Sequence, residues 1–277
     1  MLKKLLSYDF KAIFKYWWVG ALTTLILSGV GAGCGTILES EKELPITVDI
    51  FATIGMVLVV LGIVAFNIFA ELLIYVRFYK HLFTDEGYLT FTLPVKRHQI
   101  LTSKLVTGFA CGFLSLLVTF IDAAIIILTT FRKDIFVEGW FDKLTLFIKE
   151  MVAESGIPYL TAFFSELLLI GVLVLVLGLL FTYLCITFAG AISKKSKLAT
   201  AIAIYYGATS ISSVFMYMFY FFGASALFEW IDALESTATQ DNILLVLMLL
   251  IIMFVAMLCT LAYTLNYRLL DRKLNLN

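Results

Sequence analysis

The chain has 277 residues, of which 62% are hydrophobic and 14% charged, and its formal net charge is zero. A soluble domain carries about 25% charged residues, so this chain has too little charge to cover a water-exposed globule. Composition therefore excludes an ordinary soluble protein and indicates that lipid surrounds most of the surface. Four cysteines stand singly in apolar runs, which predicts buried small side chains rather than a zinc site or disulfides: Cys34, Cys111, Cys185 and Cys259.

Residues 1–16 predict an amphipathic interfacial helix. Apolar residues recur there at steps of three and four, and the opposite face carries the lysines Lys3, Lys4, Lys11 and Lys15. This pattern is typical of a helix that lies on the inner leaflet with its lysines toward anionic headgroups. The next apolar run is expected to remain as the first span, because the residues before Cys34 match a signal cleavage site poorly.

Six apolar runs follow one another along the chain, each long enough for the ~20 residues that a helix needs to cross ~30 Å of hydrocarbon. They cover residues 17–37, 50–76, 104–131, 158–190, 199–223 and 243–266. Close helix packing is predicted by the motifs Gly29-xxx-Gly33, Gly31-xxx-Gly35 and Gly108-xxx-Gly112. We therefore predict an all-α, polytopic membrane protein whose residues 17–277 form one six-helix bundle.

Lys and Arg are distributed unevenly between the predicted loops. Fifteen of the 20 lie on the side that holds both termini, whereas acids gather in the loops of the other side. The positive-inside rule then predicts that both termini are cytoplasmic. A second amphipathic stretch, residues 140–151, is expected to rest on the outer surface.

Three acids stand inside apolar runs: Glu71, Asp122 and Glu166. An ionised carboxylate in lipid costs several kcal/mol, so such residues face a cavity or a partner, or stay protonated. Glu71 lies near the cytoplasmic end of its span and can reach the headgroups. Asp122 and Glu166 are each about nine residues in from the outer end, so they are expected at one level. There they either make a structural hydrogen bond to a neighbouring helix or line a transport path.

The fifth span carries a polar stripe. Its members follow at steps of three, four, four and three, which places them on one helical face: Tyr206, Thr209, Ser213, Tyr217 and Tyr220. Hydroxyls that face hydrocarbon would lack partners. The stripe therefore predicts either a pathway lining or a helix interface.

Enzyme signatures are absent from the sequence. It has no HExxH, no GxSxG and no phosphate-binding GxxxxGK[ST], and its two histidines, His81 and His98, fall in a predicted cytoplasmic loop. We expect no catalytic residue, no metal, no cofactor of its own and no nucleic-acid partner. Any energy source is then another polypeptide or an ion gradient.

The predicted cytoplasmic loop 77–104 mixes aromatic and apolar residues with charges. Gly87 permits a sharp bend, and Pro94 can begin the helix that enters the third span. Apolar side chains on a solvated loop need a cover, which favours docking on another protein. The alternative is that they dip into the inner leaflet.

This loop resembles that of a known family. The runs Asp85-Glu86-Gly87-Tyr88-Leu89 and Thr92-Leu93-Pro94-Val95, followed by Lys104, are similar to the loop between the second and third spans of bacterial ABC transporter permeases of the type-2 export class, in particular those of Gram-positive bacteria. The resemblance implies that the loop couples to a separate ATPase subunit, which would carry ATP and Mg. It also implies pairing with a second permease copy or paralogue, and second and fifth spans that face the pathway. The implied coupling residues are Asp85, Glu86, Gly87, Tyr88, Leu93 and Pro94.

Three functions remain open at the level of sequence. The resemblance implies an exporter permease in a bacterial cell membrane, handling a hydrophobic or amphipathic peptide, lipid or drug. A proton-coupled secondary transporter would use Asp122 and Glu166, although no broken helix or repeat supports it. A membrane anchor or sensor subunit without flux is the third.

Overall fold

The computed structural model describes residues 2–40, 45–84, 87, 96–132, 140–193, 197–218, 221 and 237–272. Within these residues the chain is helical apart from short turns, and no strand occurs there. The helices are α1 (Leu2–Leu38), α2 (Ile46–Phe83), α4 (Arg97–Thr130), α6 (Trp140–Ser155), α7 (Ile157–Ile192), α8 (Lys197–Met218) and α10 (Thr237–Arg272). All except α6 are long and apolar enough to cross a membrane. The prediction of an all-α, multi-pass membrane protein is confirmed.

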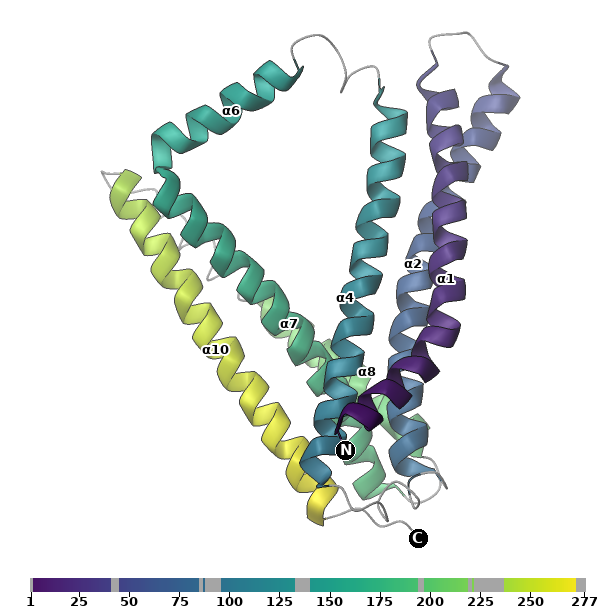
Figure 1. Ribbon diagram of the computed structural model, residues 1–277, viewed down its shortest axis with the longest axis vertical. Helices are drawn as coiled ribbons and strands as arrows, with labels where there is room; N and C mark the ends of the chain where they lie inside the picture. Colours follow the sequence, from purple (N-terminus) through teal and green to yellow (C-terminus); the bar gives the residue numbers. More distant parts are fainter. Residues whose placement is uncertain are drawn as a thin grey trace. The chain divides into compact units, whose positions relative to one another are not determined.

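Five of these helices are longer than a bilayer requires. With 34 to 38 residues each and a rise of 1.5 Å per residue, they are roughly 51–57 Å long, against ~30 Å of hydrocarbon. The predicted spans 17–37, 50–76, 158–190 and 243–266 therefore fall inside longer helices. In particular, residues 1–16 are not separate from the first span, because α1 is continuous from Leu2 to Leu38. Figure 1 shows the first turns of α1 running at an angle to the rest of this helix.

The chain divides into two compact units, which we describe separately. The first unit comprises Met1–Phe78 and Thr102–Thr145, and so contains α1 and most of α2 and α4. The second comprises Tyr79–Leu101 and Leu146–Asn277, with α7, α8 and α10. Both α2 and α4 pass from one unit into the other, since the end of α2 and the beginning of α4 belong to the second unit.

In the first unit, α1 buries one stripe at steps of three and four residues: Asp9, Ile13, Trp17, Ala21, Thr24 and Ser28. The stripe continues through Gly31 and Gly35. A Cβ atom on Gly31 would lie 2.9 Å from Val59 of α2, and one on Gly35 would overlap Thr130 of α4. Gly29 and Gly33 have open space beside them. Of the two glycine motifs in α1, the one at Gly31 and Gly35 is therefore the close packing contact.

In the second unit, α7 and α10 lie side by side (Figure 1). Asn266 of α10 is fully buried between them, and its amide donates to the carbonyl of Leu180 at 2.9 Å. The hydroxyl of Thr187 donates to Oδ1 of Asn266 at 3.0 Å. Because every polar atom of the Asn266 amide group has a partner, this contact satisfies a polar side chain inside an apolar interface.

The junction between α6 and α7 is a single residue. Gly156 has a φ of 79°, which an L side chain rarely adopts, and Pro158 lies in the first turn of α7. The amphipathic stretch predicted over residues 140–151 is helical, as part of α6.

Candidate functional site

The connection between α2 and α4 carries the predicted ATPase-coupling residues. Five of them lie outside the described residues: Asp85, Glu86, Tyr88, Leu93 and Pro94. Gly87 is described and buried, and its N–H donates to the carbonyl oxygen of Thr84 at 2.7 Å. A Cβ atom on Gly87 would lie 2.7 Å from the carbonyl oxygen of Leu82. The backbone turns so tightly here that only glycine fits without a shift.

The end of α2 is wedged against α7 in the second unit. The ring of Phe83 occupies the space beside the Cα of Gly190, so that any side chain at Gly190 would overlap it. Tyr79 stacks on Phe83 with ring centroids 6.1 Å apart, and Leu82 is fully buried. Glycine at position 190 therefore lets α7 approach the last turn of α2 closely.

The beginning of α4 is tied to the end of α10. Arg97 Nη1 donates to the carbonyls of Leu270 at 2.7 Å and of Asp271 at 2.6 Å, and it lies 3.2 Å from Oδ1 of Asp271. A cation at this position stabilises the partial negative charge of a helix C-terminus. About two turns away from this contact along α10, His98 Nδ1 and the Tyr263 hydroxyl share a hydrogen bond of 2.5 Å.

The connecting segment, residues 84–96, is thus held at both ends by helices of the second unit. Phe83 fixes one end to α7, and Arg97 and His98 fix the other to α10.

The first unit contains a buried ionic group that was not predicted from the sequence. Asp9 of α1 is fully buried; Lys104 Nζ of α4 lies 2.5 Å from its Oδ1, and Arg77 Nε of α2 lies 3.6 Å from the same atom. Ser103 donates to Oδ2 at 3.1 Å. We call these four residues the Asp9 cluster. The sequence did carry a signal, because Asp9 stands four residues before Ile13 on the apolar face of an otherwise basic segment.

From the Asp9 cluster, a stripe of small polar residues runs along α4 at steps of three and four: Ser103, Thr107, Cys111, Ser115, Thr119 and Asp122. Two of these residues accept hydrogen bonds from neighbouring helices. Trp17 of α1 donates to Ser115 Oγ at 2.7 Å, and Asn67 of α2 donates to Thr119 Oγ1 at 2.9 Å. The α4 stripe is therefore the polar seam of the first unit.

Asp122 ends the α4 stripe and differs from its other members. It is fully buried, and neither carboxylate oxygen has a hydrogen-bond partner among the described residues. Thr24 and Ser28 of α1 face it. Their hydroxyls, however, donate to carbonyls of α1 itself, at 3.0 Å and 2.9 Å. A buried carboxyl group that, within the described residues, only these two hydroxyls face is costly as an anion.

The other two intramembrane acids lie elsewhere. Glu71 is exposed on α2. Glu166 of α7 is half-buried, and its Oε2 has no hydrogen-bond partner in the described part of the chain. Asp122 belongs to the first unit and Glu166 to the second, so a shared polar level for the two stays a prediction. Among the described residues, no group of three or more His, Cys, Asp or Glu could hold a metal ion.

The predicted polar stripe of the fifth span lies on α8, apart from Tyr220, which is outside the described residues. Tyr206 and Tyr217 are about two-thirds exposed. Thr209 donates to the carbonyl of Tyr205 at 2.8 Å, and Ser213 to that of Ser210 at 2.8 Å. These two hydroxyls are therefore satisfied within their own helix and do not by themselves require a polar neighbour.

Comparison of the chain with protein-family models, with curated proteins and with solved structures finds no match.

Proposed function

We propose that this chain is the membrane-spanning permease subunit of an ABC exporter. The proposal rests on the resemblance of residues 85–95 to the coupling loop of type-2 export permeases. One structural observation supports it. The same segment is anchored at one end to α7 through Phe83 and at the other to α10 through Arg97 and His98. Such anchoring is what a coupling element needs in order to move transmembrane helices.

In this scheme the chain contributes no catalytic residue. A separate ATPase subunit binds ATP and Mg, and its closure pushes on the connecting segment. Because the ends of that segment are fixed, α7 and α10 tilt with it and convert an inward-facing pathway to an outward-facing one. A second permease copy or paralogue completes the assembly in a bacterial cell membrane, with both termini in the cytoplasm. The pathway would involve Glu71, Asp122, Glu166 and the stripe Tyr206, Thr209, Ser213 and Tyr217.

The substrate class follows from the chemistry of such a pathway. A lipid-embedded route with few charges suits a hydrophobic or amphipathic molecule, such as a peptide, a lipid or a drug. Most exposed side chains along α8 are apolar or aromatic, and Ile211, Val214 and Phe215 are examples. A route along this helix would therefore not favour a small hydrophilic solute.

Co-expression with a candidate ATPase tests the proposal. The charge reversals Asp85→Lys and Glu86→Lys are expected to lower the amount of co-purified ATPase about tenfold, which corresponds to ~1.4 kcal/mol of binding free energy. Gly87→Trp is expected to displace the turn that follows α2, where a Cβ atom already meets the Leu82 carbonyl, and to uncouple ATP hydrolysis from transport. The matched control is Asp49→Lys, at the other end of α2, where the acid is exposed. The proposal fails if no ATPase co-purifies with the wild-type chain, or if the loop variants behave like it.

Asp122 favours a second candidate, a proton-coupled secondary transporter. Its full burial and its two unpartnered oxygens suit a carboxyl group that gains and loses a proton during a cycle. This function predicts transport that collapses with the proton gradient and needs no ATP. Transport by the double variant Asp122→Asn and Glu166→Gln at the wild-type rate would eliminate it.

A further inference from the structure

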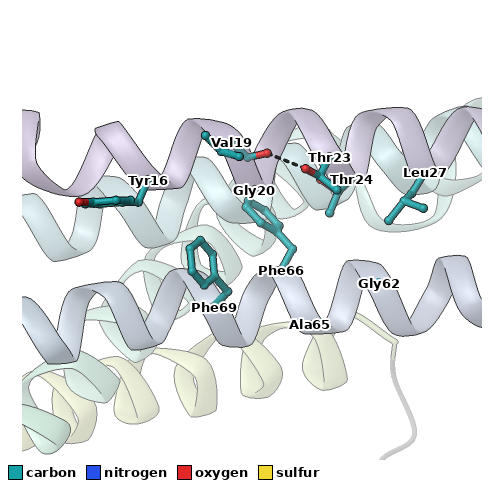
Figure 2. A pocket seen from close by; sticks show the side chains of 10 residues that line it. All are labelled: Tyr16, Val19, Gly20, Thr23, Thr24, Leu27, Gly62, Ala65, Phe66 and Phe69. Carbon is teal, nitrogen blue, oxygen red and sulfur yellow. Dashed lines mark hydrogen bonds between the residues drawn. The ribbon is translucent and has the colours of Figure 1, made fainter.

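A groove runs between α1 and α2 inside the first unit (Figure 2). It has a volume of about 350 Å³ and is lined by residues 16–27 of α1 and 62–69 of α2. Tyr16 lies at one end of the α1 wall and Leu27 at the other, and the rings of Phe66 and Phe69 rise from α2 toward α1 (Figure 2). The groove therefore follows the seam between two antiparallel helices.

Two glycines let side chains of the facing helix pack closely along this groove, and its walls are apolar. A Cβ atom on Gly20 would lie 2.9 Å from the Phe66 ring, and one on Gly62 would lie 2.8 Å from Leu27. The two threonines in the α1 wall do not make it polar. Thr23 donates to the carbonyl of Val19, as drawn in Figure 2, and Thr24 donates to that of Ala21. No hydroxyl hydrogen of these threonines is left for a ligand.

The length of the groove matches one leaflet of a bilayer. From Tyr16 to Leu27 the α1 wall is roughly 17 Å long at 1.5 Å per residue, close to half of the ~30 Å hydrocarbon core. The rim is open: Val19 is 63% and Tyr16 57% exposed. Since α1 and α2 cross the membrane, the open side of the groove faces lipid. Acyl chains are therefore the most abundant molecules that can enter it.

The two ends of the groove differ in charge. At the Tyr16 end, the Lys15 ammonium lies 5.7 Å from the centroid of the Tyr16 ring, and Lys11, one turn further on, is also exposed. Beyond Leu27 the exposed residues of α1 carry no charge, as at Val30. A lipid that lays its tail along the groove would therefore bring its headgroup to the lysines, and a negative headgroup would be attracted there.

We propose that the groove between α1 and α2 is a binding site for one anionic glycerophospholipid, with an acyl chain along the groove and the phosphate beside Lys15. The proposal does not depend on the exporter function. The site makes this lipid part of the packed structure of the first unit, because its acyl chain lies along the seam between α1 and α2, beside Phe66 and Phe69.

Native mass spectrometry of the protein released from nanodiscs of equal phosphatidylglycerol and phosphatidylcholine content tests the site. We expect the wild type to retain one phosphatidylglycerol. Gly20→Leu and Ala65→Phe, which put bulk into the groove, are expected to lose it. The matched controls are Gly29→Leu, in the same helix with open space beside it, and Ala124→Phe, on an exposed face of α4; both should retain the lipid.

The headgroup contact is tested separately with Lys15→Glu. The preference for phosphatidylglycerol over phosphatidylcholine should fall about five-fold or more, since a lysine near a membrane surface contributes ~1 kcal/mol toward an anionic lipid. The control is Lys143→Glu on α6, which should keep the preference. Equal lipid retention by the groove variants and their controls would overturn the site, as would equal retention of the two lipids by the wild type. Ala65→Phe carries the test if Gly20→Leu does not fold.

Discussion

The ammonium nitrogen of Lys104 lies 2.5 Å from a carboxylate oxygen of Asp9, and both side chains are almost completely buried. This ion pair joins α1 to α4, and Arg77 brings α2 to the same carboxylate. Three helices of the first unit thus contact the carboxylate of Asp9. Its two cationic partners, at positions 77 and 104, are far from it in sequence. An isolated buried charge is very costly, so each member of the Asp9 cluster depends on the others.

Asp9→Asn is expected to destabilise the protein by about 3 kcal/mol, because it leaves the buried Lys104 and the partly buried Arg77 without a counter-charge. Thermal unfolding in detergent, followed by circular dichroism, measures the effect. Asp49→Asn removes an exposed acid of α2 and should change stability little. Equal unfolding temperatures for the two variants would show that the Asp9 cluster does not hold the first unit together.

Asn266→Ala is expected to destabilise the packing of α7 against α10 by about 1–2 kcal/mol. The variant loses the donor to Leu180 and the acceptor for Thr187, and hydrogen bonds between membrane helices contribute up to about 1.7 kcal/mol each. Chemical denaturation in mixed micelles would measure the loss. Asn242→Ala, at an exposed position near the start of α10, is the control; a loss as large as that of Asn266→Ala would contradict the interpretation.

Arg97→Ala is expected to free the C-terminal end of α10. Its guanidinium donates to two carbonyls there, and hydrogen bonds from a charged donor contribute about 1.5–3 kcal/mol. Hydrogen exchange should accelerate in the last two turns of α10 and remain unchanged in α1. Arg132→Ala, an exposed arginine in the first unit, should leave α10 protected. Unchanged hydrogen exchange at α10 in the Arg97 variant would show that Arg97 does not anchor the beginning of α4 to α10.

Gly156→Ala should destabilise the protein by about 1 kcal/mol, because φ of 79° places a Cβ atom in a strained backbone conformation. The same substitution at Gly171, inside α7 and with open space beside it, should be neutral or slightly stabilising. Unfolding temperatures of the two alanine variants provide the measurement. A Gly156 variant as stable as the Gly171 variant would contradict the strain.

Much of the fold could be predicted from sequence because lipid imposes simple rules. Apolar runs longer than about 18 residues mark membrane helices, and the six predicted here are confirmed. The ends of the helices were less predictable. α1 continues through the basic segment without a break, since nothing between Lys15 and Trp17 stops a helix.

The interior contacts could not be read from the sequence, because they join residues far apart. The position of Asp9 on an apolar face was visible, but its partners at positions 77 and 104 were not. The hydrogen bonds of Thr209 and Ser213 were not predicted either, although they are local and lie within one helix. Their spacing indicated a polar surface, whereas each hydroxyl is satisfied by its own helix. Polar spacing alone therefore overstates the need for a polar neighbour.

The most direct test of the account is photo-crosslinking from the connecting segment. A photoreactive phenylalanine replaces Tyr88 in the cells from which the chain comes, and the cross-linked products are identified by mass spectrometry. The control position is Phe147 on α6, which is 58% exposed. The account predicts an ATPase with a phosphate-binding loop cross-linked at position 88 and absent at position 147. Products at position 88 that contain lipid and no ATPase would contradict it.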